Sequence, residues 1–238
     1  MLATVWSPKG GVGTTVTAVV VASVLARRRS VRLVDFGGDV PAVCGAHVGV
    51  PLGAADWLAL ADAAPPDALD AMALEIGEPF SLVPLGPNEL GSPSGAALDA
   101  VAQSLADGSE LNVVDAGRLP VRAIEAFLAV SVAAVAVVRP CYMALSRCAE
   151  HHALLRASTG LAVVCEPGRA LTIRDVETVL ERPVLASVPC TPDIARCVDA
   201  GVLLWRAPHE LFSSVQQLVD RLALPGAIDP PTTSGQCA

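Results

Sequence analysis

Lysine is almost absent from this chain, and aromatic side chains are scarce. Of its 16 basic residues only Lys9 is a lysine, and aromatic residues make up 3% of the sequence. The formal net charge of −8 argues against broad non-specific DNA binding, because such binding needs a basic surface that displaces counterions. Hydrophobic residues, mostly alanine, valine and leucine, make up 53%. This composition suits closely packed parallel strands covered by helices.

The patterns of disulfide, zinc and membrane proteins are also missing. The seven cysteines are odd in number and contain no C-x-x-C pair, so neither a disulfide framework nor a zinc site is predicted. The apolar run 127–138 is too short to span a bilayer as a helix. The run 16–26 follows a strand and a glycine turn, which distinguishes it from a signal-peptide core. We therefore expect a soluble, cytoplasmic protein.

Short apolar runs alternate with longer helical stretches along almost the whole chain. This alternation predicts an α/β fold with a doubly wound, mainly parallel sheet of about seven strands and helices on both faces. We expect a single domain over 1–224 and a disordered tail over 225–238. The expected strands are 2–6, 31–34, 80–83, 111–114, 131–138, 160–164 and 183–188, and the expected helices are 14–27, 54–62, 94–106, 120–128, 143–157, 172–180, 192–200 and 208–223.

The single lysine lies in a glycine-rich loop between the first strand and the first helix. Such a loop presents backbone N–H groups and a helix N-terminus to an anion, so it predicts a phosphate site in a P-loop NTPase-like domain. It differs from G-x-x-x-x-G-K-[ST], because Pro8 stands at the first glycine and Thr14 at the lysine. The expected nucleotide ligands are Lys9, Gly10, Gly11, Val12, Gly13, Thr14 and Thr15.

Two aspartates follow apolar strands, Asp35 after 31–34 and Asp115 after 111–114. A buried carboxylate is costly without a cation or hydrogen-bond partners. A single strand-end aspartate is more often a cap or turn former, but here both occur with the glycine loop. Nucleotide triphosphates bring Mg²⁺, which a loop hydroxyl and strand-end aspartates hold. We therefore predict ATP and Mg²⁺ as cofactors, with Thr15, Asp35 and Asp115 at the metal.

Four segments together resemble the ParA/MinD group of deviant Walker A ATPases, which belong to the SIMIBI class. They are K-G-G-V-G-T-T at 9–15, V-D-F-G-G-D at 34–39, V-V-D-A-G at 113–117 and V-P-C-T-P-D-I-A-R-C-V-D-A-G at 188–201. The resemblance extends from residue 1 to about 222. It implies that Lys9 reaches the partner's phosphates across a nucleotide-dependent homodimer. It also implies that Asp35 and Asp115 assist Mg²⁺ and water, and that Pro189 lies near the base.

Three positions depart from this family's pattern. Thr14 replaces the lysine that holds the β and γ phosphates, and Gly37 replaces the acid that orients water. Asp39 is close enough in sequence to substitute for that acid, so Lys9 and Asp39 are the expected catalytic residues. The stretch 165–168 stands where an asparagine reads adenine. Weak nucleotide binding with slow or absent hydrolysis is therefore expected.

The residue at position 14 also gives the loop a resemblance to the CpaE/TadZ branch, whose members mark cellular positions for pilus or secretion machinery. We expect an ATP-responsive spatial organiser for partitioning or cargo positioning, with an unidentified protein cargo or activator. A scaffold that has lost nucleotide binding stays open. So does a dinucleotide-binding oxidoreductase, because Asp35 lies about twenty residues after the glycines. Against the oxidoreductase, the chain lacks the third glycine of the G-x-G-x-x-G motif, and beyond Lys9 it has no lysine that could serve in catalysis.

Two further segments bear on partners. The predicted helix 208–223 has an apolar face but lacks the basic polar face of a membrane-surface helix, so we expect it to dock on the sheet and not on a membrane. The arginines at 27–29 and Arg32 fall near the end of the first helix, where cations complement the helix dipole.

Overall fold

The computed structural model describes residues 1–46, 49, 51–60, 63–65, 67–117 and 119–224. The predicted tail, 225–238, lies outside the described residues, as do the last two residues of the helix expected at 54–62.

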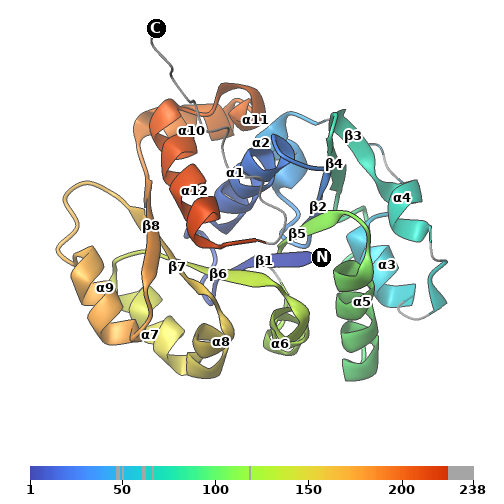
Figure 1. Cartoon of the computed structure of the whole chain (residues 1–238), viewed down its shortest axis with the longest axis horizontal. Coiled ribbons are helices and arrows are strands. Elements are labelled where there is room, and N and C mark those ends of the chain that lie inside the picture. The colour runs from blue at the N-terminus through green and yellow to red at the C-terminus, as the bar shows by residue number, and fades with distance from the viewer. Residues whose placement is uncertain (47–48, 50, 61–62, 66, 118, 225–238) are drawn as a thin grey trace, which may run out of the picture.

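Eight strands form one sheet in the described part of the chain, in the order β3-β4-β2-β5-β1-β6-β7-β8 (Figure 1). Seven of them run parallel, and β3 pairs antiparallel with β4 at one edge. The predicted doubly wound parallel sheet is confirmed, with one strand more than expected. The strands are β1 (Leu2–Trp6), β2 (Val31–Asp35), β3 (Leu74–Gly77), β4 (Phe80–Val83), β5 (Leu111–Asp115), β6 (Ala133–Val138), β7 (Gly160–Cys165) and β8 (Val184–Pro189).

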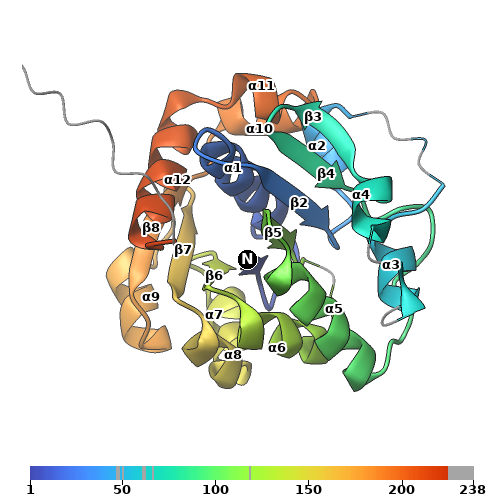
Figure 2. The same cartoon turned by 45° about the vertical axis from the view of Figure 1, so that its right-hand side comes forward.

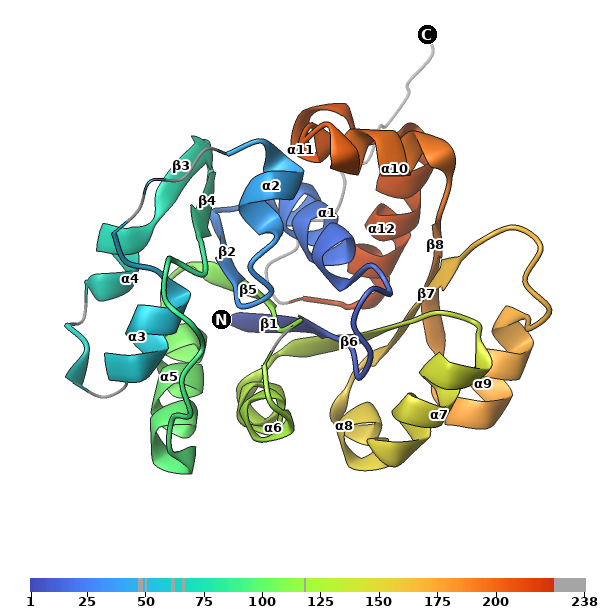
Figure 3. The same ribbon diagram turned by 180° about the vertical axis from the view of Figure 1, so that it is seen from behind.

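Helices cover both faces of the sheet, and each layer encloses its own apolar core (Figures 1 and 3). One layer contains α1 (Thr14–Ala26), α2 (Val40–Cys44), α10 (Pro192–Asp199), α11 (Leu203–Arg206) and α12 (His209–Arg221). The other contains α3 (Ala54–Leu60), α4 (Ala68–Met72), α5 (Gly95–Asp107), α6 (Val121–Val130), α7 (Tyr142–Glu150), α8 (His152–Ala157) and α9 (Ile173–Leu180).

The central strands are apolar along their whole length because helices cover them on both sides. Every residue of β1 and β6 is buried. The one indole in β1 keeps its polar atom satisfied, since Trp6 Nε1 donates to Ser158 Oγ at 2.9 Å. The sheet thus provides a rigid support whose carboxyl edge carries the candidate site.

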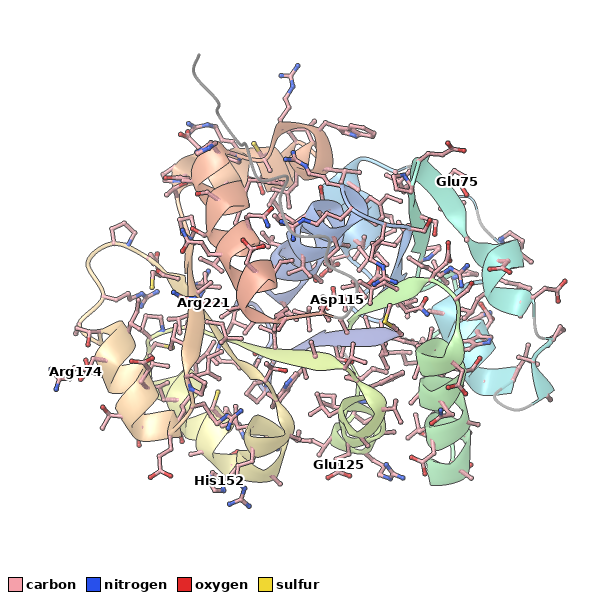
Figure 4. The ribbon with its side chains drawn as sticks, in the orientation of Figure 1. Glu75, Asp115, Glu125, His152, Arg174 and Arg221 are labelled. Carbon is pink, nitrogen blue, oxygen red and sulfur yellow. The ribbon has the colours of Figure 1, made fainter. Side chains whose placement is uncertain are left out.

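The sequence patterns missed several short elements and one break. β3 is a four-residue edge strand whose side chains alternate between half-buried and exposed, and Glu75 points outward from it (Figure 4). The helices α2, α4 and α11 have only four or five residues, too few to show a helical period. The helix expected at 143–157 is divided into α7 and α8 at His151, whose backbone is not helical.

The last helix docks on the sheet as predicted. α12 packs against β8 and α1 through the buried side chains of Leu211, Val215, Leu218 and Val219. The arginines after α1 join this contact: the Arg27 guanidinium lies 3.9 Å above the Phe212 ring, and Arg28 pairs with Asp220 at 3.2 Å. None of the described helices is long and apolar enough to cross a membrane.

Candidate functional site

The glycine loop leads from the carboxyl end of β1 into the N-terminus of α1, near the middle of the sheet (Figure 3; α1 is seen from another side in Figure 2). Gly11 and Gly13 have φ angles of 74° and 102°, a left-handed conformation that favours glycine. Gly13 precedes the first helical residue, and within the described structure no side chain caps the helix. The N–H groups of the first turn are therefore available to an anion.

A cavity of about 610 Å³ opens beside this loop. Its size is in the range of about 300–1,000 Å³ that is usual for small-molecule sites. It joins the loop to the segments that follow β2, β5 and β6. The described lining residues are Gly10, Gly11, Gly13, Thr14, Thr15, Val16, Gly37, Asp39, Ala42, Val43, Gly117, Arg139 and Val198.

Three of the predicted nucleotide ligands lie elsewhere. The Val12 side chain is buried in the core, so only its backbone is available to a ligand. Lys9 is not among the described lining residues, and its Nζ donates to the carbonyl of Gly10 at 3.3 Å. Pro189 lines a second cavity of about 480 Å³ together with Cys165, Glu166 and other residues after β7 and β8.

Asp35 and Asp115 are partners across β2 and β5, and both are fully buried. Asp35 Oδ1 accepts hydrogen bonds from the amides of Gly37 at 2.8 Å and Gly38 at 2.7 Å, and its Oδ2 accepts one from Val40 at 3.1 Å. These three bonds wrap the segment 37–40 around the carboxylate. Asp35 therefore shapes this turn in addition to any contact with a ligand.

The Asp115 carboxylate accepts fewer hydrogen bonds than that of Asp35. Its Oδ1 accepts a hydrogen bond from the Gly117 amide at 3.1 Å, but its buried Oδ2 has no hydrogen-bond partner among the described residues. Figure 4 shows Asp115 in the interior of the molecule, whereas Glu125 and Arg174 point outward. An unpartnered carboxylate oxygen in the interior is costly unless a cation or water joins it.

Burial raises the pKa of both carboxyl groups. The pKa of Asp35 rises to about 7, chiefly because burial disfavours the charge and secondly because Asp115 lies beside it, while the three backbone hydrogen bonds oppose the shift. Burial also raises the pKa of Asp115, while the nearby Thr15 hydroxyl and the Gly117 amide oppose this rise. Two adjacent buried carboxyl groups with raised pKa values are typical of a site that gains from a cation.

The donor set fits Mg²⁺ only in part. The described residues include no group of three or more His, Cys, Asp and Glu side chains placed to hold a metal. Asp35, Asp115 and the Thr15 hydroxyl offer three oxygen ligands at most. Magnesium commonly keeps several waters and completes its shell with substrate phosphates, so this set suits an ion that arrives with a nucleotide.

Solved structures with the same architecture include ParA and MinD proteins. A ParA family ATPase from Chlorobium tepidum TLS is 18% identical over 93% of this chain and 96% of its own, with a TM-score of 0.77. MinD from Pyrococcus horikoshii OT3, complexed with Mg-ADP, is 20% identical over 93% and 95%, with a TM-score of 0.75. A putative plasmid partition protein from Borrelia burgdorferi B31, bound to AMPPNP, is 14% identical over 92% and 97%, with a TM-score of 0.73.

The chain has the fold of the ParA and MinD ATPases. No protein-family model and no curated protein matches its sequence. The likeness therefore lies in the arrangement of strands, helices and loops, and the ParA/MinD fold accounts for nearly the whole described chain.

Gly37, which stands where the resemblance expects a water-orienting acid, leaves no room for a side chain here. A Cβ added there would lie 2.8 Å from Asp115 Oδ2 and 3.3 Å from Asp35 Oδ1. Asp39, by contrast, is exposed, lines the cavity and makes no capping hydrogen bond within the described chain. Of these two positions, Asp39 is the one from which a carboxylate reaches the cavity.

We expect Gly37→Ala to lower the free energy of unfolding of the ligand-free protein by about 1–3 kcal/mol, because overpacking forces the buried carboxylates to shift. Denaturant unfolding measures this difference. Gly91→Ala is the matched control, since a Cβ at Gly91 meets no heavy atom within 4 Å. Equal stability of the two variants would show that the 36–39 segment moves aside easily.

One charged residue of the described cavity lining has no counterpart in the sequence prediction. Arg139 follows β6 directly and lines the cavity. β6 lies on the side of β1 away from β5 and β2, the strands that end in Asp115 and Asp35. The position at a strand's carboxyl end, which singled out Asp35 and Asp115, also applies to Arg139. Neither the metal-ligand pattern nor the lysine motif includes an arginine at this place.

Proposed function

We propose that this protein binds Mg-ATP at the glycine loop, as a deviant Walker A member of the ParA/MinD group. The observation that carries this proposal is the buried, unpartnered Oδ2 of Asp115 beside Thr15. Asp115 lies behind the described cavity lining, which includes its neighbours Thr15, Gly37 and Gly117. The MinD and Borrelia structures with the same fold are bound to Mg-ADP and AMPPNP, which supports an adenine nucleotide here.

In this proposal the loop backbone from Gly10 to Thr15 binds the phosphates, with Val12 contributing only its amide. Thr15, Asp35 and Asp115 hold Mg²⁺, which neutralises phosphate charge when it is bound. Asp115 offers its unpartnered Oδ2, while Asp35 fixes the 37–40 turn through the hydrogen bonds that it accepts from three backbone amides. Since Gly37 covers Asp115 Oδ2, access to that oxygen requires the 36–39 segment to shift.

Hydrolysis is proposed to be weak or absent. Thr14 is buried and supplies a hydroxyl where the family has an ammonium, and Gly37 supplies no acid. Asp39 is the remaining carboxylate that can orient water, and Lys9 acts on the phosphates of a partner chain. Pro189 and the first three residues of the 165–168 stretch line the second cavity, which we assign to the base.

The biological role we propose is that of an ATP-responsive spatial organiser in the cytoplasm. The nucleotide favours a homodimer, and the dimer positions a cargo complex through a protein partner, as in partitioning or in CpaE-like marking of a secretion or pilus site. The support is the shared ParA/MinD fold together with the non-lysine residue at position 14.

Calorimetry with ATP, ADP and NAD in the presence of Mg²⁺ tests this proposal. We expect heat from ATP binding, and a loss of at least tenfold in affinity for Asp35→Ala, because charge-assisted contacts contribute about 1.5–3 kcal/mol. Glu75→Ala on the outer edge strand is a matched carboxylate control. A preference for NAD would favour the dinucleotide-binding alternative, and no heat with any nucleotide would favour a scaffold without nucleotide.

A further inference from the structure

We propose that Arg139 supplies, within the same chain, the phosphate-binding cation that Thr14 does not provide. This inference rests on the proposed function and assigns a binding role to a residue that the loop motif does not contain. The ligand it implies is the β–γ end of a polyphosphate bound at the glycine loop.

Position is the first argument. β6 lies next to β1, and Trp6 pairs with Ala136 in their parallel register. Lys9 lies three residues after Trp6, and Arg139 lies three residues after Ala136. Because the two strands run parallel, Arg139 follows β6 at the same level at which the glycine loop follows β1. Asp115 is on the opposite side of β1, where β5 pairs Val5 with Asp115. A phosphate at the loop would therefore lie between a pair of carboxylates and a guanidinium.

Charge is the second argument. Among the described residues that line the 610 Å³ cavity, Arg139 alone carries a positive charge. Lys9 is directed to its own loop through the carbonyl of Gly10. Triphosphates need counter-charge beyond a single metal ion, and backbone amides supply only partial charges. Arg139 is therefore the cation placed to neutralise phosphate within the cavity.

The contacts of the guanidinium are the third argument. Nη2 of Arg139 donates to the Cys190 thiol at 3.6 Å, a weak acceptor, and Nε is buried without a hydrogen-bond partner in the described structure. No carboxylate forms an ion pair with Arg139 among the described residues. A planar guanidinium with open donors matches two phosphate oxygens well.

The test compares Arg139→Ala and Arg139→Met with the parent chain, using two probes, Mg-ATP and magnesium tripolyphosphate, which has no base. We expect both variants to bind both probes about ten- to a hundredfold more weakly, the loss of one charge-assisted contact. Arg147→Ala is the matched control, since Arg147 is an exposed arginine of α7 that pairs with Glu150. It should bind as the parent does.

Thr14→Lys separates a phosphate contact from a structural role. If Arg139 and a lysine at position 14 bind the same phosphate, Thr14→Lys should restore the affinity of Arg139→Met for both probes. The same substitution should raise the affinity of the parent chain by a smaller factor. Three outcomes would overturn the inference and leave the proposed function standing. Thr14→Lys could raise the affinity equally in the parent and in Arg139→Met, Arg139→Met could bind both probes as tightly as the parent does, or the Arg139 variants could lose affinity for Mg-ATP alone. A parent chain that binds neither probe would overturn both.

Discussion

Replacing Asp115 with asparagine is expected to stabilise the ligand-free protein and to remove its response to Mg-ATP. The carboxylate Oδ2 is buried without a partner, and Asp115 raises the pKa of Asp35. An amide removes one buried charge and the repulsion, so we expect a gain of about 1–3 kcal/mol in the free energy of unfolding near pH 8. For a chain of this length, that gain corresponds to about 2–4 °C in Tm per kcal/mol.

The pH dependence follows from the sign of the shift. Folding raises the pKa of Asp35 from its ordinary value of 3.8 to about 7. Between these values the folded state retains a proton that the unfolded state has lost, so the free energy of unfolding falls as the pH rises through this window. Below the window both states are protonated, and above it both are ionised.

Thermal unfolding of the parent and of Asp115→Asn between pH 5 and pH 8 checks this expectation, with and without Mg-ATP. The parent should lose more stability than the variant as the pH rises, and only the parent should gain stability from Mg-ATP. A variant that is less stable than the parent at pH 8, or that retains the full gain from Mg-ATP, would contradict the role assigned to Asp115.

Lys9→Ala is expected to abolish nucleotide-dependent dimerisation without unfolding the chain. The resemblance assigns Lys9 to the partner's phosphates, and its Nζ lies at the loop surface, outside the described lining of its own cavity. Light scattering should show the 24.3 kDa parent doubling in mass with Mg-ATP, and Lys9→Ala remaining monomeric.

Lys9→Arg retains the charge and serves as the matched comparison for dimerisation. The affinity of the monomeric Lys9→Ala chain for Mg-ATP, measured alongside, separates a contact across the dimer from one within the chain. If Lys9→Ala dimerises as the parent does, Lys9 does not bind the partner's phosphates across the dimer. A parent that stays monomeric with bound nucleotide would contradict the proposed dimer itself.

The sequence predicted the architecture well because the parallel strands are continuous apolar runs. β1 and β6 are buried on both faces, so their alanine and valine runs are visible without any structure. The same strand pattern predicts the place of the loop and of both aspartates, because ligands of a doubly wound sheet lie at the carboxyl ends of its strands. Their burial and their pairing across β2 and β5 agree with that expectation.

Sequence patterns could not show contacts that arise only when distant strands meet. β3 is short and half-exposed at the edge, so its pattern is weak. The orphaned oxygen of Asp115 and the cover that Gly37 places over it depend on how the segments after β2 and β5 approach each other. Arg139 enters the cavity because β6 neighbours β1, although 130 residues separate Arg139 from Lys9 in the chain.

Titration with a fluorescent ATP analogue, with and without Mg²⁺, tests the central claim most directly. The buried carboxylates at the loop repel a free triphosphate and are neutralised by the ion that accompanies it. We therefore expect saturable binding with Mg²⁺ and binding at least tenfold weaker when Mg²⁺ is removed with a chelator. Equal affinity under the two conditions, or no binding in either, would contradict the assignment of Thr15, Asp35 and Asp115 to a magnesium-nucleotide site.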